Sequence, residues 1–173
     1  MINKNYKDES FIKTGPALIY KLENIAFELQ QNMKDSKSRF IASEILNTGK
    51  NAFHRLWPDV KPNNPYHKYS KNDFKGLYAF AIIKNGKINW QYIGVSQTIK
   101  RRFKGHTLRK TKNSATWAYL MCKSEENIHI KQKEIIHPCY FTFVKIDSNM
   151  LLHMAEVYCV NKFKSTWNSF ETH

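Results

Sequence analysis

The chain has 173 residues, 42% of them apolar, and a formal net charge of +14. This length suits one domain, or one domain with an appendage, and supplies enough apolar residues for a core. The charge favours a polyanionic partner, nucleic acid before an anionic membrane surface. Because the chain has no apolar run of about 18 residues and no secretory signal at its start, we expect no membrane span. We expect a cytoplasmic protein of prokaryotic or phage type.

Residues 1–75 predict a helical N-terminal extension. Pro16 opens an amphipathic pattern that runs to Met33, and a second helix is predicted over 38–48, closed by Gly49. Residues 58–72 contain three prolines and predict a loop at the domain boundary. DNA recognition and dimerisation are the two roles that we consider for this extension. The remaining unit spans 76–173.

The three cysteines, Cys122, Cys139 and Cys159, are widely spaced and form no Cys-x-x-Cys pair. Their number and spacing predict neither a disulfide framework nor a zinc site. Because each lies among apolar residues, we expect thiols in the core of a protein from a reducing compartment.

Residues 77–83 and 88–95 are rich in aromatic and β-branched residues, and Asn85-Gly86 lies between them, which predicts a β-hairpin. Two registers are open. A two-residue loop places Tyr78 opposite Ile93, whereas a three-residue loop places Tyr78 opposite Tyr92. Only the second collects the large apolar side chains on one face, so we predict the three-residue loop with Gly86 left-handed. The two tyrosine rings would then lie side by side.

A basic helix is predicted directly after the hairpin, with Ser96 or Thr98 as its cap. Arg102 and His106 are one turn apart and share a face. Residues 97–113 contain seven Lys or Arg residues and no acidic residue. This pattern is typical of a solvated basic face or of phosphate contacts. On the second interpretation, the nucleic-acid-binding residues are Lys100, Arg101, Lys104, Arg109, Lys110 and Lys112.

The C-terminal half predicts one more strand between helices. Residues 114–124 are predicted to be helical, 125–137 are polar, 139–146 predict a strand, and 149–164 predict a helix capped by Asp147 or Ser148. The order β-β-α-α-β-α predicts an α+β fold. Its small antiparallel sheet would hold the hairpin and a third strand, flanked by helices.

Glu156 lies on the apolar stripe that Leu152, Cys159 and Val160 form on the last helix. A carboxylate on a packed face is costly unless it is paired or bound to a metal. An internal salt bridge is one explanation. His153, one turn earlier, offers a His/Glu metal pair as another, although the sequence supplies no evident third ligand.

The two half-motifs Gly76-Leu77-Tyr78 and Tyr92-Ile93-Gly94 resemble those of the GIY-YIG nuclease family, with Leu77 where isoleucine is usual. The resemblance covers about residues 76–170 and implies a GIY-YIG-like core. It also implies a phosphodiesterase, a DNA endonuclease that leaves 5′-phosphate and 3′-hydroxyl ends. The catalytic residues that it implies are Tyr78, Tyr92, Arg102, His106, Glu156 and Asn168.

The resemblance also implies a role for each of these residues. Tyr78 would be the general base, its pKa lowered by the metal and nearby cations. Tyr92 would orient the water or phosphate, and Arg102 would stabilise developing charge. Glu156 would hold one Mg²⁺, or Mn²⁺, per active site. His106 would assist proton transfer, and Asn168 would form a structural link that positions the glutamate helix.

A free-standing chain with built-in additions resembles the restriction-type members, which are sequence-specific and act on double-stranded DNA. A homodimer would let such an enzyme cut both strands. A homing-type or structure-specific DNA nuclease is the nearest alternative. A DNA-binding module with the same fold that cleaves nothing is the alternative from another class.

Overall fold

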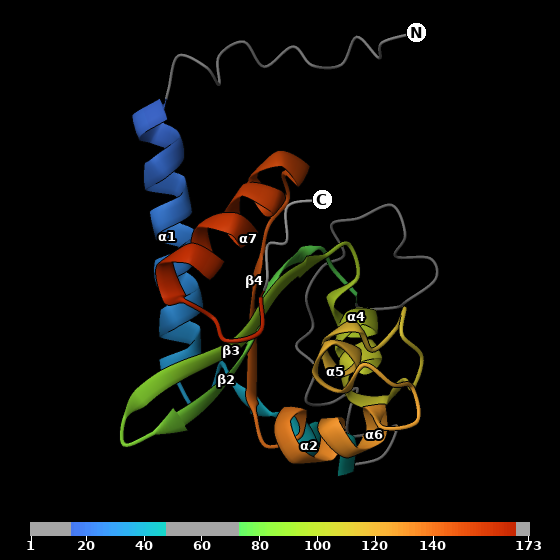
Figure 1. Ribbon diagram of the computed structural model, residues 1–173. Coiled ribbons are helices and arrows are strands. Elements are labelled where there is room, and N and C mark those ends of the chain that lie inside the picture. The colour runs from blue at the N-terminus through green and yellow to red at the C-terminus, as the bar shows by residue number, and fades with distance from the viewer. Residues whose placement is uncertain (1–14, 48–72, 169–173) are drawn as a thin grey trace, which may run out of the picture.

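The computed structural model describes residues 15–47 and 73–168 (Figure 1). The predicted loop at 58–72 and the closing Gly49 lie outside the described residues. The elements in chain order are α1 (Gly15–Lys34), β1 (Phe40–Ile41), α2 (Ala42–Asn47), β2 (Gly76–Lys84), β3 (Lys87–Ser96), α4 (Ile99–Leu108), α5 (Thr116–Cys122), α6 (Ile128–Lys131), the π-helical turn η3 (Gln132–Ile136), β4 (Tyr140–Lys145) and α7 (Asn149–Phe163).

The predicted α+β class is confirmed, but the sheet has four strands rather than three. Its antiparallel order is β1-β4-β2-β3. The additional strand is Phe40–Ile41, which pairs with Phe141 and Tyr140 instead of starting the helix predicted over 38–48. Aromatic and β-branched residues favour such pairing, and α2 begins only at Ala42, whose N–H donates to the Cys139 carbonyl.

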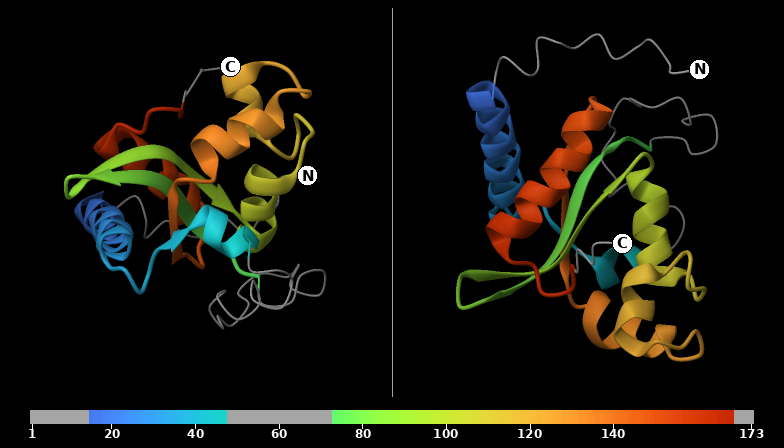
Figure 2. Two further views of the ribbon diagram at one scale, coloured as in Figure 1. Left: turned by 90° about the horizontal axis from the view of Figure 1, so that it is seen from below. Right: turned by 45° about the horizontal axis from the view of Figure 1, so that its top comes forward.

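Helices cover both faces of the sheet (Figures 1 and 2). Helices α1 and α7 pack on one face, which we call the α1–α7 face, and on it lie Leu77, Ala79, Ala81, Trp90 and Ile93. The other helices pack on the opposite face, which we call the α4–η3 face. The large buried rings of this second face are Phe74, Tyr78, Phe80, Phe103, Trp117 and Phe141.

The hairpin register that we predicted is wrong. Asn85 and Gly86 both have positive φ, 51° and 72°, and form a two-residue loop between the paired Lys84 and Lys87. Such a loop matches the right-handed twist of the strands. A register shift between Phe80 and Ala81 then leaves Gln91 without a partner in β2. The prediction failed because it assumed one buried face, whereas here both are buried.

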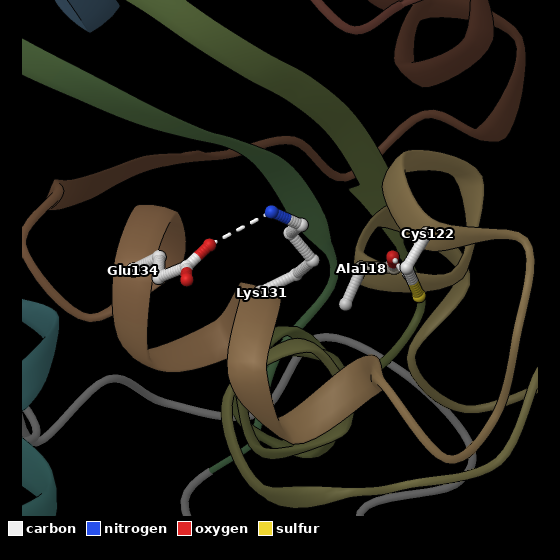
Figure 3. Close-up of polar contacts among 4 residues, drawn as sticks. All are labelled: Ala118, Cys122, Lys131 and Glu134. Atoms are coloured by element: carbon white, nitrogen blue, oxygen red, sulfur yellow. Dashed lines mark hydrogen bonds and ion pairs between the residues drawn. The ribbon is translucent and has the colours of Figure 1, made fainter.

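The polar segment 125–137 contains the α6–η3 unit. Its buried residues Ile128, Gln132 and Ile136 recur every fourth position. On its exposed side, Lys131 and Glu134 form an ion pair with an N–O distance of 2.7 Å (Figure 3). In α5, the Cys122 thiol donates to the Ala118 carbonyl, which the same figure shows. The two carbonyls that accept from the buried Gln132 amide belong to His106 and Arg109, each at 2.8 Å, so this unit holds the end of α4.

The last helix follows the prediction closely. It begins after Ser148, whose side chain accepts from the Leu151 N–H, and it runs through Phe163. All three cysteines are free thiols, and burial raises the pKa of Cys139 and of Cys159 to about 12. None of the helices in the described ranges has the length and apolar character that a bilayer span requires.

Candidate active site

Tyr78 of β2 lies at the centre of a buried polar cluster. Its side chain is 1% exposed. The phenol oxygen lies 2.9 Å from Nε2 of His106, and it accepts a hydrogen bond from Nε of Arg102 at 3.3 Å. Both partners come from one face of α4, as their spacing of four residues predicted. The structure therefore brings Tyr78, Arg102 and His106 into direct contact.

Gly94 makes room for the Tyr78 ring. Tyr78 is paired with Gly94 across the hairpin, and a Cβ at Gly94 would lie 2.6 Å from the phenol oxygen and 3.0 Å from Cε1 of Tyr92. No side chain can occupy that space without moving a ring. The two tyrosine rings are 6.2 Å apart between centroids. They are neighbours, as predicted, but through this glycine and not through direct pairing.

Arg102 is half-buried and connects three elements. Besides Tyr78, its Nη2 donates to the Thr116 hydroxyl of α5 at 2.7 Å, and its guanidinium also interacts with the Tyr92 phenol. Burial lowers the pKa of Arg102. The two phenols beside it together raise that pKa by more than burial lowers it, so the net shift is upward. Arg102 is therefore a fixed positive charge beside both tyrosines.

The protein groups around Tyr78 shift its pKa upward. We expected the metal and nearby cations together to lower the phenol pKa. Burial instead raises the pKa of Tyr78 well above 10, and the lowering effect of Arg102 is smaller. The pKa of Tyr92 is also raised, again chiefly by burial. Loss of solvation opposes the phenolate more strongly than one arginine favours it.

His106 is fully buried and neutral. Burial lowers its pKa well below 6.5, and the charge of Arg102 lowers it further. Among the described residues, neither its Nδ1 nor Nε1 of the adjacent Trp117 has a hydrogen-bond partner. A buried polar atom without a partner costs about 1–3 kcal/mol.

Glu156 approaches the cluster from α7. Its half-buried carboxylate accepts from the Val95 N–H of β3, and burial raises its pKa, against smaller lowering effects from His153, Val95 and Arg102. Its charge is also close enough to raise the pKa of both phenols. In the part of the chain that the structure describes, Glu156 makes no salt bridge, so the salt-bridge explanation is not supported.

Asn168 binds the outer edge of β3. Its amide accepts from the Ile93 N–H at 2.8 Å and donates to the Ile93 carbonyl at 2.6 Å. The preceding N–H groups of Thr166 and Trp167 donate to the carbonyls of Trp90 and Gln91. The segment after α7 thus covers the edge strand β3. Farther along the same edge, the Val95 N–H donates to the Glu156 carboxylate. Asn168 links the glutamate helix to β3.

The donor set fits a hard divalent cation held by one carboxylate. Among residues 15–47 and 73–168, no group of three or more His, Cys, Asp and Glu side chains could hold a metal. Mg²⁺ often takes one or two carboxylates and keeps several waters. Among the described residues no salt bridge offsets the burial cost of Glu156, and a bound cation would offset it. His153 is exposed and lies one turn earlier.

A basic pocket of about 580 Å³ adjoins the cluster, with Arg102 in its lining. Four of the six predicted nucleic-acid-binding residues also line it, namely Lys100, Arg101, Lys104 and Arg109. Of these, Lys100 is only 3% exposed. The other two, Lys110 and Lys112, lie exposed on the connector beyond α4, and the Lys112 ammonium lies over the Tyr119 ring.

Asp73 was missed by the sequence analysis. We expected Ser96 or Thr98 to cap α4, and neither side chain bonds to an α4 N–H. The fully buried Asp73 carboxylate caps α4 instead, accepting from the N–H groups of Lys100 at 2.8 Å and Arg101 at 3.0 Å. Its place beside the start of β2 was the available signal. Asp73 ties the strand of Tyr78 to the helix of Arg102.

The comparisons with known proteins add no relative to this geometry: no protein-family model matches the chain, and neither curated proteins nor solved structures give a match.

Proposed function

We propose that this protein is a divalent-metal-dependent DNA endonuclease of the GIY-YIG type. The observation that carries the proposal is the cluster around Tyr78. Residues separated by up to 78 positions in the chain, from Tyr78 to Glu156, converge on one phenol oxygen and its surroundings. Perturbed titratable groups of this kind concentrate at functional sites.

The protonation states favour a relay over a free phenolate. The attacking water would give its proton to the Tyr78 oxygen as the phenol proton passes to Nε2 of His106, 2.9 Å away. The neutral imidazole has a free lone pair to receive it. The hydroxide would form a bond to phosphorus as the bond from phosphorus to the 3′ oxygen breaks. The leaving oxygen would take a proton from solvent, and His106, whose pKa is lowered by burial, would give its extra proton back through Tyr78 to solvent. The products carry 5′-phosphate and 3′-hydroxyl ends.

Arg102 would contact the scissile phosphate and stabilise the charge that builds on its oxygens. Its attachment to Thr116 keeps the guanidinium in place before substrate arrives. Glu156 would hold Mg²⁺, or Mn²⁺. When bound, such an ion supplies Lewis-acid stabilisation of the phosphate and of the leaving oxygen. Tyr92, stacked on Trp117 with ring centroids 5.2 Å apart, would orient the water or the phosphate.

The basic pocket would carry the neighbouring phosphates of the DNA strand. Arg102 lines both the pocket and the Tyr78 cluster, so a strand that fills the pocket passes the candidate scissile position. Contacts of this kind give affinity that falls steeply with salt and carry no sequence information. We propose a restriction-type enzyme, in which surfaces outside the pocket read the sequence. A homing-type or structure-specific nuclease is the alternative within the same chemistry.

Supercoiled plasmid with Mg²⁺ tests the proposal, with EDTA and E156Q as controls. We expect discrete fragments that both controls abolish, since sequence-specific cleavage that depends on Glu156 and metal produces them. Nicking or smearing that both controls abolish would support a nuclease but overturn its sequence specificity. Salt-sensitive DNA binding without any cleavage would overturn the proposed nuclease activity and favour the non-cleaving DNA-binding module.

A further inference from the structure

Helix α5 contributes two adjacent residues to the Tyr78 cluster. Thr116 is the first residue of the helix and accepts from Arg102, while Trp117, the second, stacks on Tyr92 with 18° between the ring planes. One dipeptide therefore touches both groups that flank Tyr78. Sequence analysis assigned neither residue a role, because the segment 107–137 lies outside the half-motifs.

Two of the hydrogen bonds that Arg102 makes fix its plane. Nε donates to Tyr78 and Nη2 donates to Thr116, at 3.3 and 2.7 Å. The two anchors lie on different elements, β2 and α5, so the guanidinium cannot rotate away from the phenol without losing the Thr116 bond. A planar guanidinium held at two points is preorganised for a phosphate.

Trp117 does for Tyr92 what Thr116 does for Arg102. The indole is fully buried and also lies 5.1 Å from the Phe80 ring centroid, so its own position is fixed by the core. Among the described residues, the Nε1 proton of this indole has no hydrogen-bond partner. What the indole presents to Tyr92 is its flat aromatic face.

We propose that Thr116 and Trp117 are positioning residues of the candidate active site, Thr116 for Arg102 and Trp117 for Tyr92. This proposal rests on the proposed nuclease function. It assigns to α5 the task of holding the groups that receive the phosphate, so that turnover, and not substrate affinity, depends on it. Thr116 and Trp117 need not touch the DNA.

The test uses the full chain and four variants of the two residues. T116V keeps the shape of threonine and loses the hydroxyl, and T116S restores it. W117L removes the aromatic face, and W117F restores it. Matched controls lie elsewhere on the sheet: T142V removes a buried hydroxyl that donates to the Ser38 carbonyl, and W90L removes an indole stacked on Phe163.

We expect T116V to lower kcat on plasmid DNA about tenfold at unchanged KM, since one hydrogen bond to a charged group is lost. W117L should lower kcat roughly fivefold, the scale of one aromatic pair. T116S and W117F should restore most of the rate, and T142V and W90L should leave kcat as in the wild type. Wild-type turnover in T116V and W117L would overturn the proposal.

A second measurement does not depend on cleavage. The Arg102 Nε–H resonance, assigned by its loss in R102K, should exchange with water about tenfold faster in T116V than in the wild type or T142V. If the wild type cleaves no DNA, the proposed function fails while this exchange still tests the positioning. Unchanged exchange in a folded T116V would overturn the role of Thr116.

Discussion

Both faces of the sheet are buried, but they carry side chains of different chemistry. On the α1–α7 face, the strands present Leu77, Ala79 and Ile93, and Trp90 stacks on Phe163 with ring centroids 4.5 Å apart. On the α4–η3 face, the same strands present the two tyrosines. Consecutive residues of β2 alternate between the faces, so Tyr78 lies between two side chains that serve only packing.

Burial stabilises the apolar side chains of both faces, but on the α4–η3 face it also costs free energy at polar groups. Apolar side chains gain about 25 cal/mol for each Å² removed from water. On the α4–η3 face, burial also raises the pKa of Tyr78 and lowers that of His106. Perturbed titratable groups gathered in one cluster are typical of a functional site.

Glu156 is the residue that crosses this division, because it reaches the tyrosines from a helix of the α1–α7 face. We expect E156Q to lower cleavage about 1,000-fold, the scale of losing a central charge in a site. Since burial raises the pKa of Glu156, ionisation at pH 7 costs stability, so the free energy of unfolding of the variant should be slightly higher, by less than about 1 kcal/mol. Plasmid cleavage and thermal unfolding measure both effects. A variant that cuts normally would remove Glu156 from the site.

The two glycines of the half-motifs should separate stability from activity. A Cβ at Gly94 would first meet the side chains of Tyr78 and Tyr92, so G94A should lower cleavage about 100-fold and stability by about 1–2 kcal/mol. A Cβ at Gly76 would collide with the Val144 backbone carbonyl, so G76A should cost more, about 2–3 kcal/mol. Urea unfolding measures the stability of each variant, and DNA cleavage per folded molecule measures its activity. Equal activity losses per folded molecule would contradict this division.

Asp73 joins the two elements of the site without touching its tyrosines. D73A leaves the Lys100 and Arg101 N–H groups at the start of α4 without their acceptor, and we expect a loss of about 2 kcal/mol. D35A is the matched control, because Asp35 also accepts from a backbone N–H, that of Lys37, but is exposed. Its cost should be below about 1 kcal/mol. Comparable urea midpoints for the two variants would refute the buried cap.

The pH dependence of stability should carry the signature of His106. Because its folded pKa lies below 6.5, the unfolded chain binds the proton first, and the free energy of unfolding falls as pH drops below about 6.5. H106Q should remove this slope, at most about 1.4 kcal/mol per pH unit. Glu156, with a raised pKa, contributes a slope of opposite sign, so the titration is best compared in the E156Q background.

The matched control for this titration is H129Q, since His129 is exposed. Urea unfolding between pH 4 and 7 gives the slope for each variant. A slope that survives in E156Q/H106Q, or one that disappears in E156Q/H129Q, would contradict the assignment to His106.

Local patterns predicted most elements. The spacing of Arg102 and His106 predicted their shared face, and the apolar stripe of α7 placed Glu156 among buried residues. The register of the hairpin could not be predicted this way. Alternation identifies which residues share a face but not whether the second face is also covered, and helices from both ends of the chain cover it here.

Long-range contacts were outside the reach of sequence patterns. Asp73 caps a helix that begins 26 residues later, and Thr116 and Trp117 meet Arg102 and Tyr92 only once α5 folds back. No local spacing marks such pairs. The same holds for Phe40–Ile41, whose strand partner is 100 residues away.

The sequence by itself determined the class of fold, the hairpin and its following helix, and it nominated the candidate site residues, because these depend on near neighbours and on motif order. The tertiary structure decided the register, the fourth strand and the direction in which the pKa values of Tyr78 and His106 shift. Those depend on burial, and burial is a property of the assembled layers: a phenol between α4 and β3 loses its water only when both are in place.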